Sequence, residues 1–222
     1  MIFLCLGNSL TAGYPGYDPA PDGISHGYGD YNSQYEFWLK KFCIEYIEAK
    51  GSNIVEVIKN NLLFINKGVP GELTSNFLRR VNYDLLSFKP KPNFSIIIGG
   101  TNDLGWGIPN QKIFENIKML HETSREFSIF SIGGTIAPIR MEQSSSSYNK
   151  RKIALNTMLR NYFNDNEIPY AELYNGMMDD EGNLIEDYAY IDGLHFSVEG
   201  YKQMGAIIFN EVIKTIIEKE YL

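Results

Sequence analysis

Ser9, Asp192 and His195 carry the side chains that nucleophilic catalysis by serine requires. A serine hydroxyl is a poor nucleophile at neutral pH and needs a neighbouring base, and histidine titrates near neutrality. Asp192 precedes His195 by three residues, so on a turn its carboxylate can accept from the imidazole and set its tautomer. Each residue also has a plainer explanation. Ser9 and His195 could cap helices, and Asp192-Gly193 could simply form a turn.

Acyl transfer also needs hydrogen-bond donors that stabilise the developing oxyanion. Three donors are available: the backbone N–H of Ser9, the backbone N–H of Gly71 and the side-chain amide of Asn102. A glycine suits this purpose because a backbone without Cβ lets a substrate approach closely. The alternatives are a turn glycine with positive φ at Gly71 and a local turn formed by the Asn102 side chain.

These residues must be positioned by the elements that surround them. Short apolar runs predict strands and helical stripes predict amphipathic helices, in strict alternation along the chain. We expect strands over 2–6, 61–66, 94–98, 127–132 and 169–173, and helices over 34–50, 73–86, 109–121, 147–164 and 198–219. This alternation predicts an α/β fold, a three-layer α/β/α sandwich with a five-stranded parallel sheet in flavodoxin-like order. No linker or repeat divides the chain, so we expect a single domain over 1–222.

Every candidate residue follows a predicted strand or lies in the loop before the last helix. Ligands bind outside the carboxyl ends of the strands in open α/β sheets. Since the carboxyl ends of parallel strands share one edge of the sheet, we expect Ser9, Gly71, Asn102, Asp192 and His195 to meet in one crevice.

Composition excludes several partners and cofactors. The chain has 222 residues and a formal net charge of −7, which disfavours nucleic acids and anionic membranes. No window is long and apolar enough for a membrane span, and the absence of a signal peptide leads us to expect a cytoplasmic protein. Cys5 and Cys43 are expected to be buried apolar side chains, and His121 a surface or cap residue. No Cys/His cluster has the spacing of zinc ligands, and we expect neither a metal nor a cofactor.

Four short blocks, in order, resemble the SGNH hydrolases, also called GDSL-type esterases and lipases. The blocks are Gly7-Asn8-Ser9-Leu10-Thr11, Asn66-Lys67-Gly68-Val69-Pro70-Gly71-Glu72-Leu73-Thr74, Gly100-Thr101-Asn102-Asp103 and Asp192-Gly193-Leu194-His195-Phe196-Ser197. The resemblance implies a serine esterase that hydrolyses carboxylic esters without a metal, through an acyl-enzyme intermediate. Ser9 would be the nucleophile, His195 the base and Asp192 its partner, with Ser9, Gly71 and Asn102 forming the oxyanion hole.

The first block departs from the family pattern in one position. Asn8 stands where the family has aspartate. In the family pattern the aspartate at this position resembles a group that stabilises the turn and not a member of the triad. An asparagine makes a similar local hydrogen bond without the charge. We therefore expect Asn8 to adjust the electrostatics near Ser9 and to leave catalysis intact.

Candidate residues for substrate specificity come from the segments that follow the proposed catalytic blocks. The loop 14–33, rich in Gly, Pro, Asp and Tyr, begins near Ser9 and could form a wall or a lid. Tyr14, Trp106, Tyr190 and Ile191 are candidate pocket residues, with core packing as the alternative, more so for Trp106 than for the loop tyrosines. By family analogy the substrate is a small-molecule acetyl or other short-chain acyl ester. The oligomeric state is not predicted.

Other functions remain open on the same scaffold. A carbohydrate deacetylase, a lysophospholipase or thioesterase, and an acyltransferase would use the same residues. A catalytically silent domain that binds a sugar or acyl group would fit the altered first block and the aromatic loop. A nucleotide or flavin binder would fit the glycine-rich turns, but no G-x-G-x-x-G sequence opens a helix and no P-loop lysine is present.

Overall fold

The computed structural model describes residues 1–15, 31–51, 55–140 and 147–221. Five parallel strands form one sheet in the order β2-β1-β3-β4-β5, which is the predicted flavodoxin-like order. The strands are β1 (Ile2–Gly7), β2 (Leu63–Gly68), β3 (Phe94–Ile98), β4 (Phe130–Gly134) and β5 (Tyr170–Ala171). Most of the predicted loop 14–33 lies outside the described residues.

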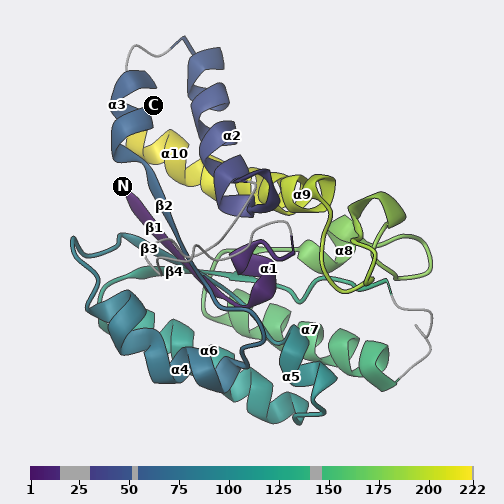
Figure 1. Ribbon diagram of the computed structural model, residues 1–222. Coiled ribbons are helices and arrows are strands. Elements are labelled where there is room, and N and C mark those ends of the chain that lie inside the picture. The colour runs from purple at the N-terminus through teal and green to yellow at the C-terminus, as the bar shows by residue number, and fades with distance from the viewer. Residues whose placement is uncertain (16–30, 52–54, 141–146, 222) are drawn as a thin grey trace.

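Helices cover both faces of the sheet, so the predicted three-layer α/β/α fold is confirmed (Figure 1). One layer contains α2 (Tyr35–Ala49), α3 (Val55–Asn61), α9 (Val198–Ile208) and α10 (Lys214–Tyr221), the last two joined by a π-helical turn, Phe209–Ile213. The other contains α4 (Thr74–Val81) with its π-helical extension Asn82–Leu86, α5 (Thr101–Gly105), α6 (Asn110–Glu126) and α7 (Ser147–Asp165). Short helices α1 (Ser9–Ala12) and α8 (Leu173–Met177), and single 3-10 turns at Tyr31–Ser33 and Glu186–Tyr188, complete the described elements.

The side chains of β1 alternate between the two faces of the sheet, so this strand contributes to the apolar core on each face. Successive side chains of a strand point to opposite faces of its sheet. Phe3 and Cys5 belong to the apolar core beneath α2 and α9, whereas Leu4 and Leu6 pack with the α4 and α6 layer. Because both faces of β1 are covered, all six of its residues are buried. Cys5 and Cys43 are both buried free thiols, as expected.

Some elements differ from the sequence-based expectations. The fourth strand begins at Phe130 and not at 127, because α6 continues to Glu126 and a turn through Ser128, with φ of 54°, separates helix from strand. Helix α3 was not predicted, and its seven residues bury only Ile58. None of the helices in the described ranges has the length and apolar character that crossing a membrane requires.

The expectation that His121 lies at the surface is wrong. Its side chain is buried between α6 and β4, where Nδ1 lies 3.0 Å from the Ser131 hydroxyl and the ring packs edge-on against Phe163. Burial disfavours the charged imidazolium and lowers the pKa of His121 to about 3. The helix continues five residues past His121, to Glu126, and His121 lies on its buried face together with Ile117, Leu120 and Ser124.

Candidate active site

Ser9 opens α1 directly after β1. Gly7 makes this sharp turn possible, since a Cβ at that position would lie only 1.9 Å from Thr11 Oγ1. Asn8 is the N-cap of α1, and its side-chain oxygen accepts from the Leu10 N–H at 3.0 Å. As the first residue of the helix, Ser9 has a backbone N–H without an acceptor inside the helix. Ser9 therefore presents both a hydroxyl and a backbone donor at the end of β1.

The structure brings His195 against Ser9 although 186 positions separate them. His195 Nε2 lies 2.9 Å from Ser9 Oγ, and His195 Nδ1 lies 2.6 Å from Asp192 Oδ2. The second carboxylate oxygen, Oδ1, accepts from the backbone N–H groups of Leu194 and His195, both at 2.9 Å. A hydroxyl, an imidazole and a carboxylate thus form one hydrogen-bonded chain, the arrangement that activates a serine.

The surroundings keep the Asp192 carboxylate ionised. Partial burial alone would raise its pKa, but the N–H groups of His195 and Leu194 outweigh burial and hold the Asp192 pKa below its ordinary value. The carboxylate on Nδ1 fixes the orientation of the ring, with Nε2 as the ring nitrogen that faces Ser9 Oγ. Both Ser9 and His195 are buried, so little water competes for this contact.

Gly71 lies in the turn that follows β2, and β2 is the neighbour of β1 in the sheet. Its φ of 79° is a conformation that favours glycine. The Gly71 N–H donates no hydrogen bond to any part of the chain that the structure describes. Two contacts hold this region against the segment around Ser9: Asn66 of β2 donates to the Thr11 carbonyl of α1 at 2.7 Å, and the Val69 N–H in the turn donates to the Gly7 carbonyl at the end of β1 at 3.0 Å. The turn is therefore fixed relative to Ser9.

Asn102 lies in α5, the short helix that follows β3. Gly100, with φ of 113°, allows the chain to turn from β3 into this short helix. Asn102 Nδ2 donates to the Glu72 carbonyl at 2.9 Å. A side-chain amide has two N–H donors, so one remains after this bond. The contact joins Asn102 directly to the turn that contains Gly71.

Sequence reasoning missed two residues that brace this region. Asp103 accepts from both the backbone N–H and the hydroxyl of Thr74, and burial raises its pKa. Arg80 donates to the Gly7 carbonyl at 2.9 Å and pairs with Glu72 and Asp84, both at 2.7 Å. Asp103 belongs to the block Gly100-Thr101-Asn102-Asp103, so the sequence offered a signal for it. Nothing in the local sequence marks Arg80.

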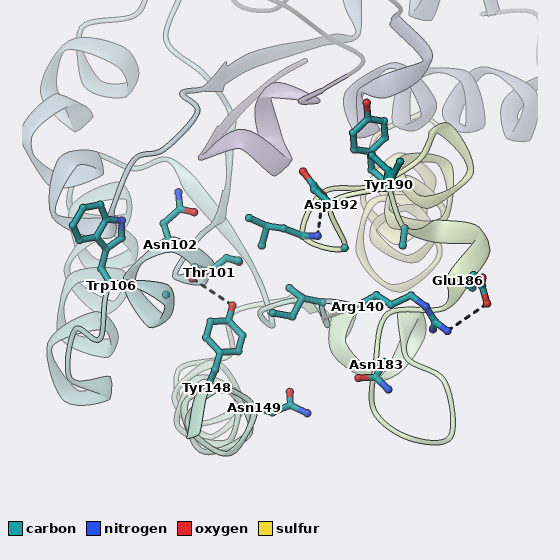
Figure 2. Close-up of a pocket in the computed structure, with 16 residues that line it drawn as sticks. Thr101, Asn102, Trp106, Arg140, Tyr148, Asn149, Asn183, Glu186, Tyr190 and Asp192 are labelled. Atoms are coloured by element: carbon teal, nitrogen blue, oxygen red, sulfur yellow. Dashed lines mark hydrogen bonds and ion pairs between the residues drawn. The ribbon is translucent and has the colours of Figure 1, made fainter. Parts of the chain in front are cut away.

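An open cavity of about 1420 Å³ adjoins the site (Figure 2). Asn102 and Asp192 belong to its wall and connect it to the hydrogen-bonded chain of Ser9 and His195. The residues lining it are Thr101, Asn102, Gly105, Trp106, Ile139, Arg140, Tyr148, Asn149, Asn183, Glu186, Ala189, Tyr190, Ile191, Asp192, Gly193 and Leu194. Nothing in the sequence analysis singled out Arg140, Tyr148, Asn149, Asn183 or Glu186, because they come from segments that carry no local motif.

Three of the four expected pocket residues line this cavity. Trp106, Tyr190 and Ile191 do so, and Trp106 is 78% exposed, which excludes the core-packing alternative for it. Tyr14 is not among the lining residues. Its ring instead packs edge-on against the His195 imidazole, with 4.5 Å between ring centroids. Within the described ranges, no cluster of three His, Cys, Asp or Glu side chains could hold a metal ion.

Comparison with known proteins places these residues in a family context. The model of the GDSL-like Lipase/Acylhydrolase family matches residues 5–203, a span that contains all five predicted site residues. No curated protein matches the chain in sequence.

Several solved structures share the fold. A lipase/acylhydrolase from Enterococcus faecalis is 24% identical, with a TM-score of 0.69 and coverage of 96% of both chains. A GDSL-like lipase from Bacteroides thetaiotaomicron VPI-5482 is 22% identical, with a TM-score of 0.67, covering 98% of this chain and 88% of the other. A variant of an acetyl xylan esterase from Geobacillus stearothermophilus is 14% identical, with a TM-score of 0.69, covering 95% and 93%. At these identities the likeness concerns the fold alone.

Proposed function

The chain belongs to the GDSL-like lipase/acylhydrolase family, and on that premise we propose that it is a serine esterase acting on short-chain acyl esters through Ser9, His195 and Asp192. The observation that carries the proposal is the continuous hydrogen-bonded chain from Ser9 Oγ to His195 Nε2 and from His195 Nδ1 to Asp192 Oδ2. A cap or a turn needs no such chain, so its presence favours catalysis over the plainer explanations of each residue.

In the proposed reaction, His195 Nε2 takes the proton from Ser9 Oγ as the oxygen attacks the ester carbonyl carbon. The tetrahedral intermediate collapses, the C–O bond to the alcohol breaks, and His195 returns the proton to the leaving alkoxide. A water molecule then gives a proton to His195 and attacks the acyl-enzyme carbonyl. The bond to Ser9 Oγ then breaks as His195 returns its proton to Oγ, which releases the carboxylic acid and restores both the serine hydroxyl and the neutral base.

The oxyanion would be stabilised by the Ser9 N–H, the Gly71 N–H and the remaining N–H of Asn102. These donors support the proposal because they come from the ends of three adjacent strands and are held by the Asn102–Glu72 hydrogen bond. Donors that are already fixed need no reorganisation when negative charge develops on the carbonyl oxygen.

A short acyl group is favoured by the chemistry of the adjoining cavity. Its described wall mixes aromatic rings, side-chain amides and two carboxylates, Glu186 and Asp192. A long alkyl chain there would bury polar groups without replacing their hydrogen bonds to water, which costs free energy. An acetyl or similar acyl group avoids this cost.

The proposal is tested by labelling the protein with a fluorophosphonate probe, mapping the adduct, and assaying p-nitrophenyl acetate, butyrate and octanoate. We expect an adduct on Ser9, turnover that falls with chain length, and loss of turnover in Ser9→Ala. Ser87→Ala, which removes an exposed hydroxyl from another part of the molecule, serves as the matched control. Absence of an adduct at Ser9, or unchanged turnover in Ser9→Ala, would overturn the assignment.

A further inference from the structure

The cavity beside the candidate active site is larger than an acyl group alone requires. Ligand pockets for small molecules commonly enclose about 300–1,000 Å³, and this cavity measures about 1420 Å³. Asn102 and Asp192 belong both to the wall of the cavity and to the candidate active site. A group bound in the cavity therefore lies next to the proposed reacting atoms. The side chains of its wall therefore indicate the chemistry of the alcohol part of the substrate, which is bonded to the acyl group.

Aromatic side chains stand on different sides of the cavity. Figure 2 shows Trp106 beside Asn102 on one side, Tyr190 near Asp192 on the other, and Tyr148 of α7 between and below them. Trp106 is 78% exposed, and its ring makes no ring contact or hydrogen bond with the described part of the chain. Leaving so large an apolar face in water is unfavourable, and such faces in a cavity commonly mark binding sites.

Two amides line the end of the cavity away from Trp106, with Asn149 below Tyr148 and Asn183 below Arg140 (Figure 2). The side chains of Asn149 and Asn183 line the cavity and make no hydrogen bond with any residue that the structure describes. The Tyr148 hydroxyl donates only a long contact, 3.4 Å, to the Thr101 carbonyl. An amide offers two donors and an acceptor, so these groups match a ligand with several hydroxyls, each of which both donates and accepts.

The charges in the cavity disfavour an anionic ligand. Arg140 is the one cationic side chain among the described lining residues. Its guanidinium is already paired with Asp179 at 3.2 Å and Glu186 at 3.3 Å, and it donates to the Leu184 carbonyl at 3.0 Å. Glu186 and Asp192 add negative charge to the same wall. A phosphate headgroup would therefore meet no free cation, whereas a neutral ligand incurs no such penalty.

We propose that the alcohol part of the substrate is a carbohydrate of two or more sugar units, in which one ring lies with its apolar face on Trp106 and the hydroxyls of a further unit exchange hydrogen bonds with Asn149 and Asn183. A sugar ring combines C–H faces that suit an aromatic surface with a rim of hydroxyls that suits the amides. This inference rests on the proposed esterase function and defines its substrate class.

The test compares two triacetates that differ in the presence of a ring. Acetate release is measured for methyl tri-O-acetyl-β-xylopyranoside and for glyceryl triacetate, which has as many acetyl groups on an acyclic polyol. We expect the wild type to prefer the xyloside at least tenfold in kcat/KM. Trp106→Ala should reduce this preference about tenfold, the order expected for losing one aromatic contact of roughly 1.4 kcal/mol. Tyr83→Ala, which removes an equally exposed ring on the α4 extension, should leave the preference unchanged.

A binding measurement separates this inference from the esterase proposal. Ser9→Ala protein is titrated with unacetylated xylobiose and with lysophosphatidylcholine by calorimetry. We expect xylobiose to bind, and its binding to be lost in Ser9→Ala/Trp106→Ala but kept in Ser9→Ala/Tyr83→Ala. Equal hydrolysis of both triacetates together with no binding of xylobiose would overturn the carbohydrate inference, and so would preferential binding of the lysophospholipid. Absence of hydrolysis with xylobiose still bound would overturn the esterase proposal alone.

Discussion

The carboxylate of Asp103 accepts hydrogen bonds from both the hydroxyl and the backbone N–H of Thr74, at 2.7 and 3.0 Å. Thr74 is the first residue of α4, and Asn116 of α6 donates to the same hydroxyl at 2.9 Å. The buried Asp103 thus joins α5, which carries Asn102, to the segment that follows Gly71. Two of the proposed oxyanion donors are held together by a residue that touches neither the proposed nucleophile nor the base.

We predict that Asp103→Asn lowers both stability and turnover. The amide has a single acceptor oxygen. If that oxygen keeps the bond to the Thr74 hydroxyl, the NH₂ group replaces Oδ2, so the buried Thr74 N–H loses its 3.0 Å acceptor and keeps only the longer, 3.2 Å contact to Oδ1. Such a loss costs about 1–3 kcal/mol, measurable as the free energy of unfolding in urea. Turnover of p-nitrophenyl acetate should fall as well. Asp165→Asn, at the exposed end of α7, is the control, and equal behaviour of the two variants would contradict the bracing role.

We predict that Asn102→Ala lowers kcat by about 10²–10³, as expected for removing one oxyanion donor, with a smaller change in KM. The variant also loses the hydrogen bond to the Glu72 carbonyl. Asn60→Ala controls for that loss, since the exposed Asn60 amide likewise donates to a backbone carbonyl, that of Glu56, at 2.9 Å. If steady-state kinetics gave the two variants the same kcat, Asn102 would have no part in the oxyanion hole.

We predict that Asn8→Asp changes kcat by less than about 10²-fold, or roughly 2.7 kcal/mol. Asparagine and aspartate cap helices about equally well, so the introduced carboxylate would still accept from the Leu10 N–H and keep Ser9 at the start of α1. Asn8→Ala removes the cap, at a cost of about 0.5–2 kcal/mol in unfolding free energy, and should reduce turnover more than Asn8→Asp does. The reverse order of turnover would show that charge at this position matters more than the cap.

We predict that His121→Gln weakens the dependence of stability on acid pH. The folded-state pKa of His121 is about 3, below the ordinary value of about 6.5. Between these values the unfolded chain binds a proton that the folded chain does not, so stability falls as pH decreases. Between pH 7 and pH 5 this loss amounts to about 2 kcal/mol. Urea unfolding at both pH values should show a smaller difference in the variant than in the wild type, and an unchanged difference would contradict a neutral buried imidazole.

The order of elements and the strand arrangement were predictable from the sequence because they depend on local patterns. Apolar runs that end in glycine, such as Ile2–Gly7, predict buried strands, and alternating strands and helices allow few parallel topologies. Element boundaries were less predictable. The residues after His121 continue helically until a positive-φ turn at Ser128, and no strong helix-stop residue marks that end.

Residue types and their positions at strand ends indicated which side chains could do chemistry, and that much the sequence determined by itself. Only the tertiary structure decided that His195 reaches Ser9 across 186 positions, that Asn102 binds the turn containing Gly71, and that Trp106 faces a cavity and not the core. The physical reason is that a side chain's partner depends on packing between layers. In the folded sheet, α5, the segment after β4 and the loop before α9 all lie at the same edge. No local sequence pattern shows which of their side chains then come into contact.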